Sequence, residues 1–210
     1  MQQANQTEHP KPKTTQQLSE EELKELKLIW KRGADELIRI TKPISSFEIT
    51  ERNKLIIEGL FWWFFNDPRS CYDLNKGILL KGGKGTGKTT LVKSFQKLFK
   101  ALQQSFAFST AQTISLDYAM NGDVDFWLRE KVMAIDEVGR EEKAKYFGNG
   151  LSVIGYILHE RYSIWQSKGI ATIATTNLDS SDIESLYGET IRDRCKEMFN
   201  HIILDGESRR

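Results

Sequence analysis

The residues with the clearest chemical potential form a glycine-rich run, Gly82–Thr89, which fits the spacing G-x-x-x-x-G-K-[ST]. In such a run the glycines let backbone N–H groups turn inward around phosphate oxygens. Lys88 then reaches the β- and γ-phosphates, and Thr89 offers its hydroxyl to Mg²⁺. A short predicted strand, Ile78–Leu80, precedes the run, and a periodic helix, Thr89–Leu102, follows it. The pattern predicts a nucleotide site with ATP and Mg²⁺ as ligands. The residues expected to bind the nucleotide are Gly82, Gly83, Lys84, Gly85, Thr86, Gly87, Lys88, Thr89 and Thr90.

Two adjacent carboxylates, Asp136 and Glu137, come directly after another apolar strand, Val132–Ile135. The carboxyl ends of parallel strands face the ligand crevice of an α/β sheet, so both acids are expected beside the phosphate-binding run. Asp136 suits the ligand shell of Mg²⁺, and Glu137 could orient or deprotonate the attacking water. In isolation this pair would be a surface turn, but together with the phosphate-binding run it indicates hydrolysis.

Further polar residues follow a buried strand, Ile170–Thr175. Asn177 at its exit could hydrogen-bond to the γ-phosphate or to the water held by Glu137, although a lone strand-end Asn is more often a turn residue. Arg192 and Arg194 come next in the chain and would ordinarily be solvated helix charges. The candidate catalytic residues are Lys88, Glu137, Asn177, Arg192 and Arg194, and the candidate metal ligands are Thr89 and Asp136.

From Gly77 onward, short apolar runs alternate with amphipathic helices. This alternation predicts an α/β fold of the P-loop NTPase type, with a five-stranded, mainly parallel sheet and helices on both faces. The predicted strands are Ile78–Leu80, Phe106–Phe108, Val132–Ile135, Ile170–Thr175 and His201–Leu204. The predicted core helices are Thr89–Leu102, Leu151–Gln166 and Ser181–Met198.

The part of the chain before Gly77 lacks this alternation, and two helices are predicted in it. Ser19 and the three acids after it make a capping box, which predicts a helix over Glu20–Thr41. A second helix, Thr50–Phe65, ends in the aromatic run Phe61–Phe65, which we expect in the core. The expected divisions are a flexible tail (1–18), an N-terminal helical extension (19–45) and the ATPase core (46–210).

Composition excludes several classes of protein. Hydrophobic residues make up 39% of the chain, as in globular proteins, but no apolar run approaches the roughly 20 residues that span a bilayer. The N-terminus has no apolar signal region, and the two cysteines have no metal-ligand spacing. A net charge of +1 gives no general electrostatic case for nucleic-acid binding. We therefore expect a cytoplasmic protein.

The motifs resemble those of the AAA+ ATPases of the DnaC-like helicase-loader group, which includes the ATPase partners of some transposases. The resemblance covers about Asn53–Leu204, and phage- and mobile-element-borne members look most similar. It rests on Gly85–Thr89, Ile135–Gly139, Glu160–Tyr162, Thr175–Leu178, Tyr187–Gly188 and Arg192–Arg194.

The resemblance implies that the phosphate-binding, metal and carboxylate residues have the roles given above, and that Asn177 is the sensor residue. Arg194 matches an arginine finger inserted into the nucleotide site of a neighbouring subunit, with Arg192 as an assistant. Arg161 would either face a neighbour or have a structural role. A finger supplied in trans is worth about 10³–10⁵ in rate, so a nucleotide-dependent homo-oligomer is expected.

The family also implies a replicative helicase or another DNA-transaction protein as partner, and single-stranded DNA as a ligand. Thr190 stands where relatives often carry another Arg, and Ser109–Lys131, the region that relatives use for DNA, is short. The chain ends soon after the fifth strand, so no helical lid domain is expected. The helix Glu20–Thr41 either docks the partner or packs on its own core.

Other functions remain open on the sequence. A P-loop kinase would explain the phosphate-binding run but not the acids, Asn and arginines that follow it. A nucleotide-dependent binding module with little hydrolysis would need Lys88 but neither Glu137 nor Arg194. Helicase loader and transposase partner share the same motifs, so the sequence does not separate them.

Overall fold

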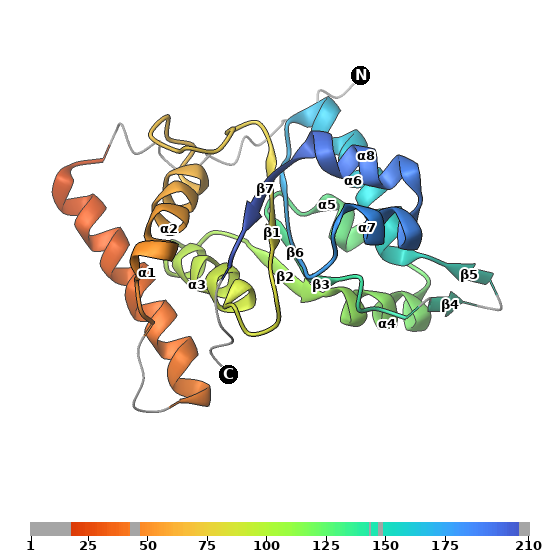
Figure 1. Cartoon of the computed structure of the whole chain (residues 1–210), viewed down its shortest axis with the longest axis horizontal. Coiled ribbons are helices and arrows are strands. Elements are labelled where there is room, and N and C mark those ends of the chain that lie inside the picture. The colour runs from red at the N-terminus through yellow and green to blue at the C-terminus, as the bar shows by residue number, and fades with distance from the viewer. Residues whose placement is uncertain (1–17, 43–46, 143, 147–148, 206–210) are drawn as a thin grey trace, which may run out of the picture.

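Five parallel strands form the centre of the computed structural model (Figure 1). The structure describes residues 18–42, 47–142, 144–146 and 149–205. In spatial order the strands are β2 (Ala107–Thr110), β3 (Met133–Val138), β6 (Thr172–Thr176), β1 (Gly77–Lys81) and β7 (Phe199–Ile203). All neighbouring pairs are parallel. The predicted five-stranded α/β sheet is confirmed, and β6 lies between β1 and β3.

Helices cover both faces of this sheet, because each strand sends alternate side chains to opposite sides (Figure 1). Ile78 and Leu80 of β1 belong to one hydrophobic core, whereas Leu79 belongs to the other. The first core is closed by α1 (Glu20–Thr41), α2 (Glu51–Phe64) and α3 (Lys88–Ala101). The second is closed by α4 (Ala111–Asn121), α5 (Asp125–Arg129), α6 (Val153–Lys168) and α8 (Glu189–Met198).

The N-terminal helix α1 packs on its own core. Ser19 caps it as predicted, accepting a hydrogen bond from the backbone N–H of Glu22. Trp30 is 3% exposed and lies with its ring 5.7 Å from that of Phe95 on α3. The Phe64 ring of α2 also stacks on Phe95, with ring centroids 4.2 Å apart. Of the two roles considered for α1, packing is the one that its apolar face performs.

The aromatic run at the end of α2 is part of the same core, as expected. Phe61, Phe64 and Phe65 are buried, while Trp62 and Trp63 are partly buried. The indole N–H of Trp63 donates to the carbonyl of Lys76 at 2.9 Å, which satisfies its polar atom.

The stretch Ser181–Met198, which is predicted to be helical, is interrupted once. The structure has two helices, α7 (Ser180–Tyr187) and α8, separated at Gly188. Gly188 has a φ of +91°, a conformation that residues with a side chain rarely adopt. The chain changes direction there, which sets the orientation of the helix that carries Arg192 and Arg194.

Two helices and one hairpin were not predicted. The helices α4 and α5 fill the connection between β2 and β3, and a hairpin of β4 (Ala144–Tyr146) and β5 (Asn149–Leu151) precedes α6. The buried residues of α4 are Ala111, Ile114 and Ser115, and only Ile114 is a large apolar residue. The sequence of α4 therefore shows no strong apolar periodicity.

Among the described residues no helix is both long and apolar enough to cross a bilayer. Apart from Leu18, the predicted tail lies outside the described residues.

Candidate nucleotide-binding site

A cleft of about 1050 Å³ opens at the carboxyl ends of β1, β3 and β6. It is lined by the loop before α3, by Asp136 and Glu137 at the end of β3, and by Asn177 after β6. The cleft is therefore lined by residues of β3 and β6 and of the loop after β1, which are far apart in sequence. It also extends to Phe47 and Glu48, close to the start of α2.

The glycine-rich loop owes its shape to backbone conformations that favour glycine. Gly87 has a φ of +96° and stands at the N-cap of α3, so the helix starts at Lys88 with its free N–H groups facing the cleft. Gly82 lies against the C-terminal segment: a Cβ atom there would be 2.3 Å from the carbonyl oxygen of Leu204. A helix N-terminus preceded by a glycine loop is a natural binding site for phosphate.

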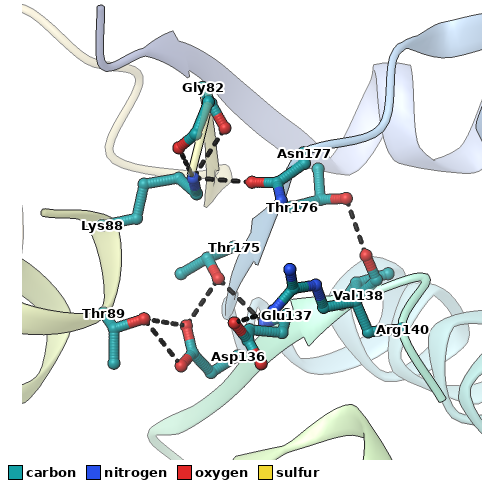
Figure 2. Close-up of polar contacts among 11 residues, drawn as sticks. Gly82, Lys88, Thr89, Asp136, Glu137, Val138, Arg140, Thr175, Thr176 and Asn177 are labelled. Atoms are coloured by element: carbon teal, nitrogen blue, oxygen red, sulfur yellow. Dashed lines mark hydrogen bonds and ion pairs between the residues drawn. The ribbon is translucent and has the colours of Figure 1, made fainter. Parts of the chain in front are cut away.

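Lys88 lies at the mouth of this loop, and its side chain is largely buried at 9% exposure. Its Nζ donates to the carbonyls of Gly82 at 2.6 Å and Gly83 at 2.8 Å. A third bond, at 2.8 Å, goes to Oδ1 of Asn177 (Figure 2). The ammonium group thus joins the phosphate-binding loop to the predicted sensor residue.

Asp136 is the buried acid of the site, with 2% exposure. Its carboxylate accepts hydrogen bonds from the Thr89 hydroxyl at 2.9 and 3.1 Å and from the Thr175 hydroxyl at 2.6 Å (Figure 2). Mg²⁺ prefers such oxygen donors and is usually held by one or two carboxylates together with substrate phosphates. In the described ranges no group of three or more His, Cys, Asp or Glu could hold a metal. The Thr89 hydroxyl and the Asp136 carboxylate are oxygen donors side by side, and they fit Mg²⁺ that binds together with a nucleotide.

Glu137 has an unusual backbone, with a φ of +58°. The pairing of β3 with β6 shifts register between Ile135 and Val138, so Asp136 and Glu137 form an irregularity in the strand. The Glu137 N–H donates to Thr175 Oγ1 at 2.9 Å, and its carboxylate accepts from Arg140 Nη1 at 2.5 Å (Figure 2). The two acids therefore point differently, as a metal ligand and a catalytic carboxylate would need to.

The candidate arginines lie elsewhere. Among the described residues that line the cleft there is neither Arg192 nor Arg194. Arg192 forms ion pairs with its own acidic neighbours, Glu184 at 2.5 Å, Asp193 at 2.8 Å and Glu189 at 3.1 Å.

Arg194 is less restrained. Its guanidinium lies 4.8 Å from the centre of the Tyr162 ring and donates to the His159 carbonyl at 3.3 Å. The side chain is partly exposed. Arg161, by contrast, is fully buried and donates to Thr172 and to the carbonyls of Glu130 and Ala171, which favours a structural role.

Sequence reasoning missed several residues of the site. The sequence places Thr175 in a strand and in one of the resembling motifs but gives it no role of its own, although a hydroxyl at a buried strand end is a usable signal. Arg140 lies in the loop after the acids, and Phe47 and Glu48 reach the cleft from the N-terminal side. No local pattern marks Phe47 and Glu48, because their approach depends on the packing of distant segments, whereas Arg140 is only three residues from Glu137.

No protein-family model matches the sequence, and no curated protein matches it. Solved structures do match the fold. The crystal structure of the DnaC helicase loader has a TM-score of 0.55 and 19% identity, over 76% of this chain and 93% of that one. For the DnaI crystal structure the values are 0.52 and 19%, over 80% and 89%. The replication initiator DnaA, bound to AMPPCP and single-stranded DNA, gives 0.53 and 18%, over 78% of this chain and 50% of that one.

At these identities the likeness concerns the fold, and the resemblance drawn from the motifs is confirmed at that level. The chain has a fold like that of the DnaC and DnaI structures, with a five-stranded parallel sheet and helices on both faces.

Proposed function

We propose that this protein hydrolyses ATP and acts in DNA replication as a helicase-loader-like factor. The observation that carries the proposal is the meeting of Lys88, Asp136 and Glu137 in one cleft, at the N-terminus of α3. A small-molecule kinase would share the phosphate loop, but it would not need Asn177 bonded to Lys88.

In this proposal the triphosphate lies over the N-terminus of α3, where backbone N–H groups and the helix dipole favour negative charge. The Lys88 ammonium, now held by two carbonyls and Asn177, exchanges these partners for phosphate oxygens. Thr89 and Asp136 would hold Mg²⁺, which neutralises charge that develops on the phosphates. Glu137 accepts a hydrogen bond from the attacking water, and Asn177 orients that water or the γ-phosphate.

The base of the nucleotide would occupy the other end of the cleft, where Phe47 and Ile38 are apolar and Glu48 and Lys42 are polar. Apolar walls with a few polar groups are usual for small-ligand sites. Support for a purine nucleotide comes from the AMPPCP in the DnaA structure, which has the same fold.

The arginine of the site would come from a second copy of this chain. Arg194 lies outside the cleft of its own subunit and is bonded weakly, by one 3.3 Å contact and one ring contact. Its release to a neighbour therefore costs little, whereas Arg192 would have to give up three ion pairs. We propose Arg194 as the finger and assign Arg192 mainly to fixing α8 against α7.

The test is ATP turnover per subunit across a wide range of protein concentration, for the wild type and Arg194→Ala. Arg129→Ala is the matched control, because Arg129 is an exposed arginine with a single ion pair. For a finger supplied in trans, we expect the turnover rate of the wild type to rise with protein concentration. In Arg194→Ala this rate should be lower by about 10³-fold or more. A flat rate that Arg194→Ala does not change would exclude the shared site.

The replication role needs its own experiment. A tagged wild-type chain should retain a purified replicative helicase in the presence of ATP. A tagged Lys88→Ala variant, which lacks nucleotide binding, should not retain it. Retention of a transposase but not of the helicase would favour the transposition alternative. Retention of neither would remove the loader proposal while leaving the ATPase proposal intact.

A further inference from the structure

We propose that Thr175 is a positioning residue that sets both carboxylates of the site through its single hydroxyl group. This inference rests on the proposed function, in which Asp136 holds Mg²⁺ and Glu137 acts on water. Thr175 touches neither nucleotide phosphate nor water in that scheme, so its effect passes through the two acids.

The hydroxyl of Thr175 makes two hydrogen bonds at once. It donates to Asp136 Oδ1 at 2.6 Å and accepts from the backbone N–H of Glu137 at 2.9 Å. Thr175 is 1% exposed, so water does not compete for these bonds. Figure 2 shows the hydroxyl between Asp136 and Glu137, on the strand next to theirs. One buried group therefore contacts both acids.

The bond to Asp136 fixes the carboxylate. Thr89 also donates to Asp136, but in the proposed complex the Thr89 hydroxyl is shared with Mg²⁺. Thr175 is then the partner that keeps the carboxylate plane in place. Hydrogen-bond partners behind a metal ligand usually contribute 10- to 100-fold in metal affinity or activity.

The bond to Glu137 holds a strained backbone. A non-glycine residue with a φ of +58° costs of order 1 kcal/mol or more, so it persists only where neighbours hold it. Glu137 has no residue opposite it in the register of β3 with β6, which shifts between Ile135 and Val138. Thr175 supplies the acceptor for the Glu137 N–H, and the direction of the Glu137 side chain follows from that backbone geometry.

Three variants separate the hydroxyl from the shape of the side chain. Thr175→Val keeps the branched shape and removes both bonds, whereas Thr175→Ser keeps the hydroxyl and removes a methyl group. Thr172→Val is the matched control, because Thr172 is a buried threonine of the same strand that bonds to Arg161 and lies outside the cleft.

The readout is metal binding rather than activity alone. Mn²⁺ is titrated into the protein with AMPPCP and followed by electron paramagnetic resonance, and AMPPCP affinity is measured without metal. For Thr175→Val we expect Mn²⁺ affinity about 10- to 100-fold weaker, with metal-free nucleotide affinity unchanged. Thr175→Ser should stay close to the wild type, and Thr172→Val should bind Mn²⁺ normally. ATP turnover should require correspondingly more Mg²⁺ in Thr175→Val.

Normal Mn²⁺ affinity in Thr175→Val, or an equal loss in Thr175→Ser, would overturn the inference. If Thr175→Val does not fold, Thr175→Cys is used instead: its weak S–H donor should give an intermediate loss, and wild-type affinity there counts against the proposal. Failure of the proposed function looks different, because the wild type itself would then show no metal-dependent AMPPCP binding or no ATP turnover.

Discussion

Replacement of Arg161 by Leu is expected to destabilise the fold strongly without acting on a neighbouring subunit. Arg161 is fully buried on α6. Its guanidinium donates to Thr172 Oγ1 at 2.8 Å and to the carbonyls of Glu130 at 2.7 Å and Ala171 at 3.0 Å. Burial lowers the pKa of Arg161 to about 10, still well above neutral pH, so the group remains charged there.

The magnitude follows from these bonds. A fourth, longer bond of 3.3 Å goes to the carbonyl of Leu128, so Arg161→Leu leaves four acceptors without their donor. At about 1 kcal/mol each the loss is roughly 4 kcal/mol, and the removed cost of burying a charge returns part of it. We expect a net loss of about 3–4 kcal/mol, a large share of the 5–15 kcal/mol of a typical domain.

Urea unfolding of the wild type, Arg161→Leu and Arg161→Lys measures this loss. Arg161→Lys keeps the charge but has one nitrogen for acceptors that diverge, so it should fall between the other two. A drop in melting temperature of roughly 6–16 °C should accompany Arg161→Leu. A loss below about 1 kcal/mol would refute the reasoning. A stable variant with reduced, concentration-dependent turnover would instead place Arg161 at a subunit interface.

Two further substitutions test the loop after the acids. Arg140→Ala frees the Glu137 carboxylate from an ion pair that is about one-third exposed and worth up to about 1 kcal/mol, so ATP turnover should rise by up to about fivefold. A fall in turnover would instead make Arg140 part of the reaction. Gly139→Ala should lower the unfolding free energy by about 1–3 kcal/mol, since Gly139 has a φ of +92° and a Cβ there lies 2.3 Å from Leu178. Gly169→Ala, with a φ of +64° and open space, is its control and should cost less in urea unfolding.

Much of the local structure could be read from the sequence. The capped helix Glu20–Thr41 has the predicted bounds, and all five strands lie within a few residues of their predicted places. Periodicity and caps decide such elements, because they depend on neighbours along the chain. The helix α4 was not predicted because its apolar periodicity is weak. The break at Gly188 was not predicted because a positive φ leaves no mark in the pattern of apolar residues.

The candidate nucleotide-binding site was likewise predicted in part. The loop Gly82–Thr89 carries its chemistry in consecutive residues, so its spacing alone determined where phosphate and Mg²⁺ should bind. The meeting of Lys88 with Asn177, and of Asp136 with Thr175, was decided by the order of strands in the sheet. Since β6 lies between β1 and β3, its carboxyl end reaches both the phosphate loop and the acids. That order depends on how two hydrophobic cores close on opposite faces of the sheet, which is a property of the whole chain.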